Sequence, residues 1–131
     1  MFPPGTTEYT QYWEEEQRRC VEGYTAEDGD YISGYNYFYL NYCPIGRIVY
    51  EKSVDKHGKE IEKRVPAVAF PDFYDYDYYY FQAVEEAEEQ GKHMCVLKSR
   101  RKGFSYKNAS MACRNYYMIP NSKSYIYASD Q

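Results

Sequence analysis

The sequence has few of the residues that build zinc sites, membrane spans or secretion signals. Only two histidines occur, His57 and His93, and the four cysteines include no C-x-x-C pair, so we expect no structural zinc. We expect the cysteines to be reduced, small and buried, as in cytoplasmic proteins. No segment approaches the roughly 18 consecutive apolar residues of a membrane span. The first residues lack the charged region followed by an apolar region that marks a signal peptide.

Acidic residues are almost absent from the last third of the chain. Residues 92–131 hold eight lysines and arginines and one acid, Asp130, for a net charge of +7. Residues 1–91 hold eight basic and nineteen acidic residues, for a net charge of −11. This asymmetry favours polyanion binding by the C-terminal third, and nucleotide phosphate and DNA are the two candidates.

The most informative stretch is V-L-K-S-R-R-K-G-F-S-Y-K at residues 96–107. It has the character of an apolar strand end, a cationic turn and a helix start, and such a turn can offer backbone N–H groups to phosphate. The common pattern is G-x-x-x-x-G-K-[ST], whose lysine contacts phosphate and whose hydroxyl ligates magnesium. Gly103 supplies the second glycine and Ser105 the hydroxyl. Phe104 occupies the lysine position, and Ser99 follows the place of the first glycine.

Lys98 can supply the missing charge from the other end of the loop. It closes the expected strand, and its four-carbon stem can curl over the turn towards the phosphates. The alternative is a solvated basic turn, because four cations in five residues usually lie on the surface. Apolar residues at 94–97 and a helix-like segment after the loop favour the nucleotide interpretation.

Two strings in the chain resemble one protein family. K-S-R-R-K-G-F-S resembles the variant Walker A loop of phage terminase large subunits, the ATP-driven motors that package bacteriophage DNA. G-Y-N-Y-F-Y-L-N-Y-C-P-I resembles a segment ahead of the ATPase core in tailed-phage terminases, including those of the crAss-like group. The resemblance implies that Lys98 is the phosphate lysine, Arg100 the catalytic arginine that serves the γ-phosphate, and Ser105 the magnesium ligand.

The resemblance also implies the rest of the site and its partners. Gln82, or an aromatic residue near it, would hold the adenine of ATP. Double-stranded viral DNA, a portal protein, a small terminase subunit and a ring of identical subunits would be partners in the host cell cytoplasm. The remaining loop residues expected at the nucleotide are Ser99, Arg101, Lys102, Gly103 and Phe104.

We expect an α/β chain that forms the N-terminal portion of a P-loop NTPase fold of the ASCE type, with a parallel sheet. Residues 1–91 would form a helical and hairpin region, and residues 92–131 the first strand, P-loop, helix and second strand. The carboxylates that position magnesium and activate water would follow residue 131, as would the nuclease domain. Asp130 is a weak candidate for a catalytic acid. The piece is therefore expected to be inactive alone.

The individual elements follow from caps, spacing and turn residues. Thr6 or Thr7 and Gly23 bound a helix over roughly 8–22. Ser33 can cap a helix before Pro44, although the alternating tyrosines fit a strand equally well, and the resemblance implies a helix there. The other expected elements are strands at 47–53 and 60–68, a helix over 72–91, a strand at 92–97, a helix at 105–118 and a strand at 124–129.

Two other functions remain open on the sequence. The first is a nucleic-acid-binding module in which the cations of residues 98–107 grip phosphate and nearby tyrosines stack on bases. The second is an inactive structural or regulatory phage protein that keeps the fold, with the shifted lysine as a sign of decay.

Overall fold

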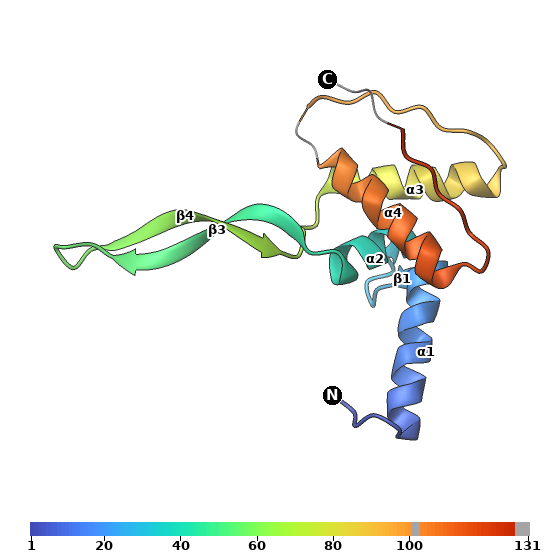
Figure 1. The fold of residues 1–131 in the computed structure, drawn as a ribbon, viewed down its shortest axis with the longest axis horizontal. Helices are drawn as coiled ribbons and strands as arrows, with labels where there is room; N and C mark the ends of the chain where they lie inside the picture. Colours follow the sequence, from blue (N-terminus) through green and yellow to red (C-terminus); the bar gives the residue numbers. More distant parts are fainter. Residues whose placement is uncertain (101–102, 128–131) are drawn as a thin grey trace.

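The computed structural model describes residues 1–100 and 103–127, which form a helical body and a long two-stranded arm (Figure 1). The helices are α1 (Thr7–Glu22), α2 (Gly34–Tyr42), α3 (Asp75–Glu89) and α4 (Phe104–Met118). The strands are β1 (Tyr24–Thr25), β2 (Tyr31–Ile32), β3 (Ile45–Val54) and β4 (Glu60–Ala69). The fold is mixed α/β, and both of its small sheets are antiparallel pairs, β1 with β2 and β3 with β4.

Both ends of α1 lie where the sequence predicts them. The Thr6 hydroxyl accepts a hydrogen bond from the backbone N–H of Tyr9 at 3.2 Å, which caps the helix start. Gly23 ends the helix with φ +95°, and its N–H donates to the Arg19 carbonyl at 3.0 Å. A Cβ at position 23 would lie 2.6 Å from the Ile32 carbonyl oxygen. Both the backbone angle and the lack of space therefore require glycine.

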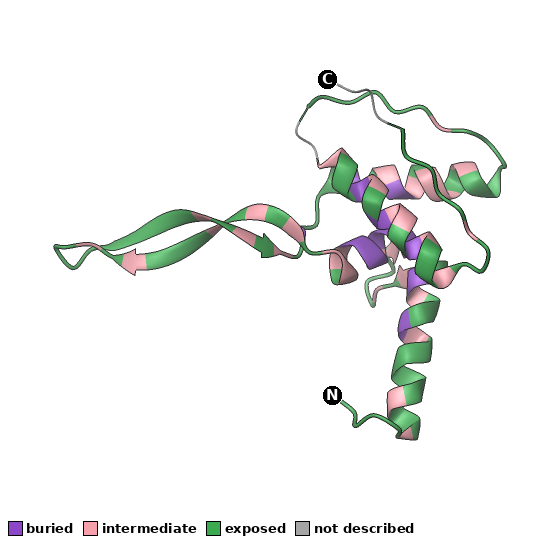
Figure 2. Cartoon of the chain, in the orientation of Figure 1, coloured by how far each residue is buried: buried purple, intermediate pink, exposed green. Residues whose placement is uncertain are grey.

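α2 is the centre of the body and packs against α1, α3 and α4. The segment is a helix rather than a strand. The Ser33 side chain accepts a hydrogen bond from the backbone N–H of Asn36 and thereby caps the start of α2. Its buried Tyr35 and Tyr39 form the core with Phe81 of α3, and the rings of Tyr39 and Phe81 are 5.5 Å apart. Figure 2 shows that the buried residues gather where the helices meet and are absent from the arm.

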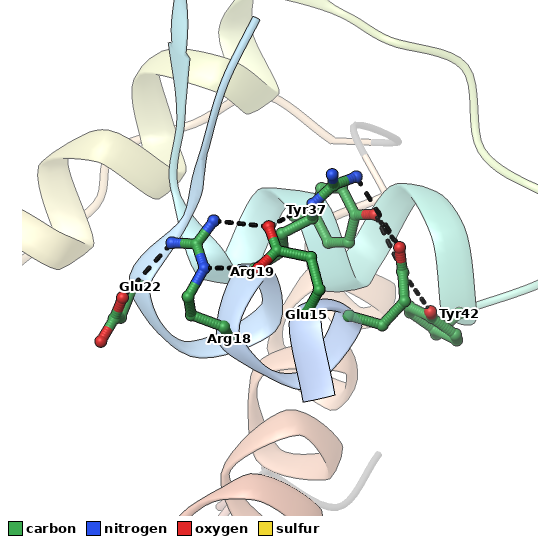
Figure 3. A network of polar contacts seen from close by, with 7 residues as sticks. Glu15, Arg18, Arg19, Glu22, Tyr37 and Tyr42 are labelled. Atoms are coloured by element: carbon green, nitrogen blue, oxygen red, sulfur yellow. Dashed lines mark hydrogen bonds and ion pairs between the residues drawn. The ribbon is translucent and has the colours of Figure 1, made fainter. Parts of the chain in front are cut away.

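Polar contacts hold α1 against α2 (Figure 3). The carboxylate of the buried Glu16 accepts hydrogen bonds from the hydroxyls of Tyr37 at 2.9 Å and Tyr42 at 2.5 Å. Next to it, Glu15 pairs with Arg18 on the surface of α1. A hydrogen bond from Arg18, assisted by a neighbouring arginine, lowers the pKa of Glu15 to about 2.

The predicted hairpin forms and is slightly longer than expected. Its register runs from Ile45 opposite Ala69 to Val54 opposite Glu60. Gly58 makes the turn with φ +78° and donates its N–H to the Asp55 carbonyl at 3.1 Å. Figure 1 shows β3 and β4 running away from the helices.

The predicted helices α3 and α4 also form, and Arg114 anchors α4 to the end of α1. Its Nε donates to the Cys20 carbonyl at 2.9 Å and its Nη2 to the Val21 carbonyl at 3.0 Å. The guanidinium carbon lies 4.2 Å from the centre of the Tyr35 ring. These contacts satisfy carbonyl groups that have no partner within α1.

The predicted parallel sheet is not found in the part of the chain that the structure describes. Residues 92–97 form no strand, and neither do residues 124–127 of the segment expected at 124–129; residues 128 and 129 lie outside the described range. Leu97, expected inside a sheet, is fully exposed. A parallel strand is stable when neighbouring strands and helices bury both of its faces. Two short segments do not provide those neighbours, and the hairpin strands lie elsewhere.

The cysteines are free, but only part of their prediction is correct. Cys20 is buried and Cys43 half-buried, whereas Cys95 and Cys113 are exposed. Cys95 belongs to the segment that forms no strand, which explains its exposure. Across residues 1–100 and 103–127, no helix combines the length and apolar character needed to cross a membrane.

Candidate phosphate-binding loop

α4 begins with a backbone that suits an anion. Gly103 is its N-cap residue and adopts the left-handed conformation, with φ +67° and ψ +23°, which glycine tolerates without steric cost. The nearest atom to a Cβ built at this position would be the Tyr39 hydroxyl at 4.0 Å, so the angle and not the space favours glycine. As a glycine, this N-cap residue offers no side-chain hydrogen-bond partner to the first turn. The first N–H groups of the helix have no partners within it.

Lys98 reaches the start of α4 from the preceding segment. Its ammonium group lies 5.4 Å from the centre of the Phe104 ring, within the range of a cation–π contact. The same ammonium lies 3.4 Å from the carbonyl oxygen of Ser99. The Lys98 side chain therefore reaches the first residue of α4.

A cleft of about 380 Å³ lies between this turn and α3. One of its walls is the contact of the Tyr80 and Phe104 rings, whose centres are 5.2 Å apart and meet edge to face. The Tyr80 hydroxyl donates to Asn108 Oδ1 at 3.0 Å, and burial raises the pKa of Tyr80. The cleft is lined by Tyr76, Tyr80, Val96, Leu97, Lys98, Ser99, Phe104 and Lys107.

A buried ion pair joins α3 and α4 beside the cleft. The Lys107 ammonium lies 2.6 Å from Asp77 Oδ1, and the two side chains are 4% and 6% exposed. The ammonium also lies 5.1 Å from the ring centre of Tyr76 and 5.4 Å from that of Tyr80. Because Asp77 neutralises this cation, Lys107 is occupied in holding the two helices together. Lys98 remains as the exposed cation of the cleft lining.

Ser105 and Arg100 flank the cleft-lining residues without lining the cleft themselves. Ser105 lies in the first turn of α4 and is exposed. Arg100 is exposed as well, immediately before the two undescribed loop residues, Arg101 and Lys102. The structure therefore brings Lys98, Ser99 and Phe104 together at the helix start, which Gly103 caps. Arg101 and Lys102, which were also predicted to contact the nucleotide, lie outside the described residues.

Gln82 lies apart from the cleft. Its Nε2 donates to the Tyr78 hydroxyl at 2.8 Å within α3. At 3.6 residues per turn, Gln82 lies about 200° around the helix from Tyr80, which lines the cleft. The aromatic residues of α3, rather than Gln82, border the space next to the loop.

The described residues bring no three His, Cys, Asp or Glu side chains together at a metal-binding geometry. Magnesium at nucleotide sites takes few protein ligands and completes its shell with phosphate oxygens and water. The hydroxyl of Ser105 at the start of α4 fits such a site only in the presence of a bound phosphate.

The buried pair of Asp77 and Lys107 is the feature that our sequence reasoning missed. Asp77 lies within a run of alternating aspartates and tyrosines, for which the sequence predicts a helix but identifies no partner of the aspartates. The signal was its spacing of four residues from the buried Phe81, because residues at i and i+4 share a helix face. An acid on that face indicates a buried cation partner.

Comparisons with known proteins add no family to this geometry. No protein-family model matches the chain, no curated protein matches it, and no solved structure matches its fold.

Proposed function

We propose that the chain is the N-terminal ATPase portion of a phage terminase large subunit, which uses ATP to translocate viral DNA into the procapsid. The observation that carries this proposal is the position of the Lys98 ammonium over Phe104 at the first turn of α4. A lysine displaced to the start of the loop thereby still delivers its charge to the helix N-terminus. That charge and the N–H groups after Gly103 are the two features that a polyphosphate requires.

The loop residues have distinct roles in this proposal. Lys98 and the backbone N–H groups after Gly103 hold the β- and γ-phosphates, and Arg100 serves the γ-phosphate. Ser105 ligates magnesium together with phosphate oxygens. Arg101 and Lys102 extend the positive charge of the loop. The exposure of Lys98, Arg100 and Ser105 leaves these side chains accessible to a nucleotide.

The adenine in this proposal stacks on the aromatic wall of the cleft. Tyr80 and Phe104 already meet edge to face at its boundary, and an aromatic ring suits a purine face. Gln82 would need a rearrangement of α3 to reach the same space.

The P-loop fold is also part of the proposal. Residues 92–97 and 124–129 flank α4 in the order of a strand, loop, helix and strand unit. We propose that they pair as parallel strands once the strands of a longer chain complete the sheet. Hydrolysis then depends on carboxylates from those later strands, while the portal protein, small terminase subunit and DNA engage the assembled ring.

The test is binding of ATP with magnesium, measured by calorimetry or with a fluorescent ATP analogue. It should use this chain and a chain extended by two or three strands. Lys98→Ala and Ser105→Ala are expected to abolish binding in the extended chain. The matched control is Lys123→Ala, because Lys123 is an exposed lysine that does not line the cleft. Binding that survives Lys98→Ala would refute the shifted-lysine loop.

A nucleic-acid-binding module is the second candidate, and exposed tyrosines near the C-terminus favour it. Tyr117, Tyr125 and Tyr127 are 74%, 73% and 90% exposed, and Lys123 lies among them. Aromatic rings of this kind stack on bases while nearby cations contact phosphates. Salt-dependent binding of single-stranded DNA, unchanged by nucleotide, would support this candidate over the ATPase. Binding of neither ligand would favour an inactive structural phage protein.

A further inference from the structure

The arm formed by β3 and β4 lacks a covering layer. In the described residues its sheet has only these two strands, and a two-stranded hairpin is at best marginally stable in water without further packing. Apolar side chains nevertheless recur along it, and Ile48, Tyr50 and Val68 are 48%, 64% and 76% exposed. The arm runs away from the helices (Figure 1), so the body of the same chain leaves most of it uncovered.

The register of the arm shows which backbone groups point outward. At its turn, the Asp55 N–H donates to the Lys59 carbonyl at 2.9 Å. Hydrogen-bonded and non-hydrogen-bonded pairs alternate along an antiparallel ladder. Odd-numbered pairs such as Val49 with Val65 therefore bond within the hairpin, and the even-numbered residues direct their N–H and C=O groups to the outer edges.

The two outer edges are consequently unequal. Pro66 is an even-numbered residue in the middle of β4, so the outer edge of β4 lacks a donor there. Proline at such a position is a common way to block strand addition. β3 contains no proline, so its outward donors and acceptors are complete. Any added strand should therefore join β3 rather than β4.

We propose that β3 pairs with β3 of a second copy of this chain, antiparallel across a two-fold axis at Val49. The two arms then form a four-stranded sheet. The inference is independent of nucleotide binding. In an antiparallel pairing about a two-fold axis, the residues before the axis lie opposite the residues after it in the second copy. Such a pairing is favourable when these two sets of side chains are complementary, and the side chains on the two sides of Val49 are.

In this register, Ile48 lies opposite Tyr50 of the second copy, and Arg47 lies opposite Glu51 of the second copy. The symmetry repeats both pairs on the other side of the axis. An apolar pair and an opposite-charge pair across strands are both stabilising. Arg47 already pairs with Asp72 of its own chain and donates to the Phe70 carbonyl at 2.9 Å. A guanidinium group has five N–H donors, so donors remain for a second carboxylate.

Other two-fold registers lose this match. An axis at Glu51 would place two glutamates opposite each other, and an axis at Lys52 would do the same with two lysines. An axis at Tyr50 would leave Lys52 opposite Ile48 and Glu51 opposite Val49. Like charges directly opposite each other are destabilising, so the axis at Val49 is the register that charge favours.

The first test is the self-association of the whole chain, measured by sedimentation equilibrium over a range of concentrations. Ile48→Lys introduces two lysines into the centre of the pairing and should weaken association at least about tenfold. Val68→Lys is the matched control, because Val68 is an exposed β-branched residue on the same face of the arm but on β4. It should associate as the unmodified chain does.

The second test reads the register by disulfide cross-linking under oxidised glutathione, in a background where the exposed Cys95 and Cys113 are serine. Directly opposed residues of a non-hydrogen-bonded pair bring their Cα atoms to about 4.5 Å, which permits a disulfide. Val49→Cys should therefore cross-link two chains. Ser53→Cys should not, because the two copies of residue 53 would lie about 26 Å apart at 3.3 Å per residue.

Three results would overturn the proposal. The first is a chain that remains monomeric at every concentration tested. The second is association that Ile48→Lys leaves unchanged, which would place the contact outside β3. The third is cross-linking through position 53 in preference to position 49, which would exclude this register.

Discussion

The helical body and the β3–β4 arm make opposite use of similar side chains. Both contain large apolar side chains, yet the buried residues among those that the structure describes all belong to the body and its immediate connections, and none to β3 or β4. Phe81 in the body is completely buried, whereas Tyr50 in the arm is 64% exposed. The body and the arm differ in whether a second element covers the apolar side chains, because an apolar face forms a core only where another helix or sheet packs on it.

Inside the body, buried charged side chains join neighbouring helices. Glu16 connects α1 to α2, Asp77 and Lys107 connect α3 to α4, and Arg114 connects α4 to α1. Each of these side chains is buried. In the arm the charged residues instead remain at the surface. The body should therefore be sensitive to loss of a charge, and the arm should be tolerant.

The largest expected effect is the loss of Asp77. Asp77→Ala leaves the Lys107 ammonium buried without its partner, which should lower the free energy of unfolding by about 3–5 kcal/mol. Urea unfolding followed by circular dichroism measures the change. The matched variant replaces both residues, as Asp77→Leu with Lys107→Met, and should be far less destabilising because no charge is left unpaired. Equal losses in the two variants would show that the pair contributes by packing and not by charge.

Alkaline pH should destabilise the body through its buried tyrosines. Burial, with a smaller contribution from Asp77, raises the pKa of Tyr39 from 10 to about 12. Between these values the unfolded chain has lost the proton that the folded chain retains, so the free energy of unfolding falls as pH rises. One such tyrosine contributes a loss of about 1.4 kcal/mol per pH unit, or about 2.7 kcal/mol over the window.

Tyr39→Phe tests this pH dependence. The substitution removes one titrating group and breaks no hydrogen bond between side chains of the residues that the structure describes. Urea unfolding at pH 9, 10, 11 and 12 should show a smaller alkaline loss than in the unmodified chain. Tyr50→Phe in the exposed arm is the control and should retain the full loss. An unchanged pH dependence in Tyr39→Phe would remove Tyr39 from the titrating set.

A smaller effect is expected from Arg114. Arg114→Met retains much of the aliphatic packing and leaves the Cys20 and Val21 carbonyls without their donors. Unsatisfied buried groups cost about 1–3 kcal/mol, which urea unfolding would measure. Lys123→Met changes an exposed cation instead and should remain within about 0.5 kcal/mol. A loss no greater than in this control would mean that water replaces the guanidinium.

The local elements of this fold could be predicted from the sequence, and the contacts between them could not. Thr6, Gly23 and Ser33 mark helix ends by chemistry that involves only neighbouring residues. The pairing of Asp77 with Lys107 spans 30 residues, and only the docking of α3 on α4 brings them together. The strand expected at 92–97 was wrong for the same reason, because a strand depends on partners that its own residues do not specify.

The smallest expected effect comes from shortening the arm. Replacing residues 50–64 with Asp-Gly joins Val49 to Val65, which are opposite each other in the register, through a turn suited to two-residue hairpins. Because the removed residues include none that is buried, the free energy of unfolding of the body should change by less than about 0.5 kcal/mol. Urea unfolding at concentrations too low for self-association isolates the body from the stabilising effect of a dimer. A loss of about 2 kcal/mol or more would show that the distal arm supports the helices, and the division between a self-sufficient body and an uncovered arm would no longer hold.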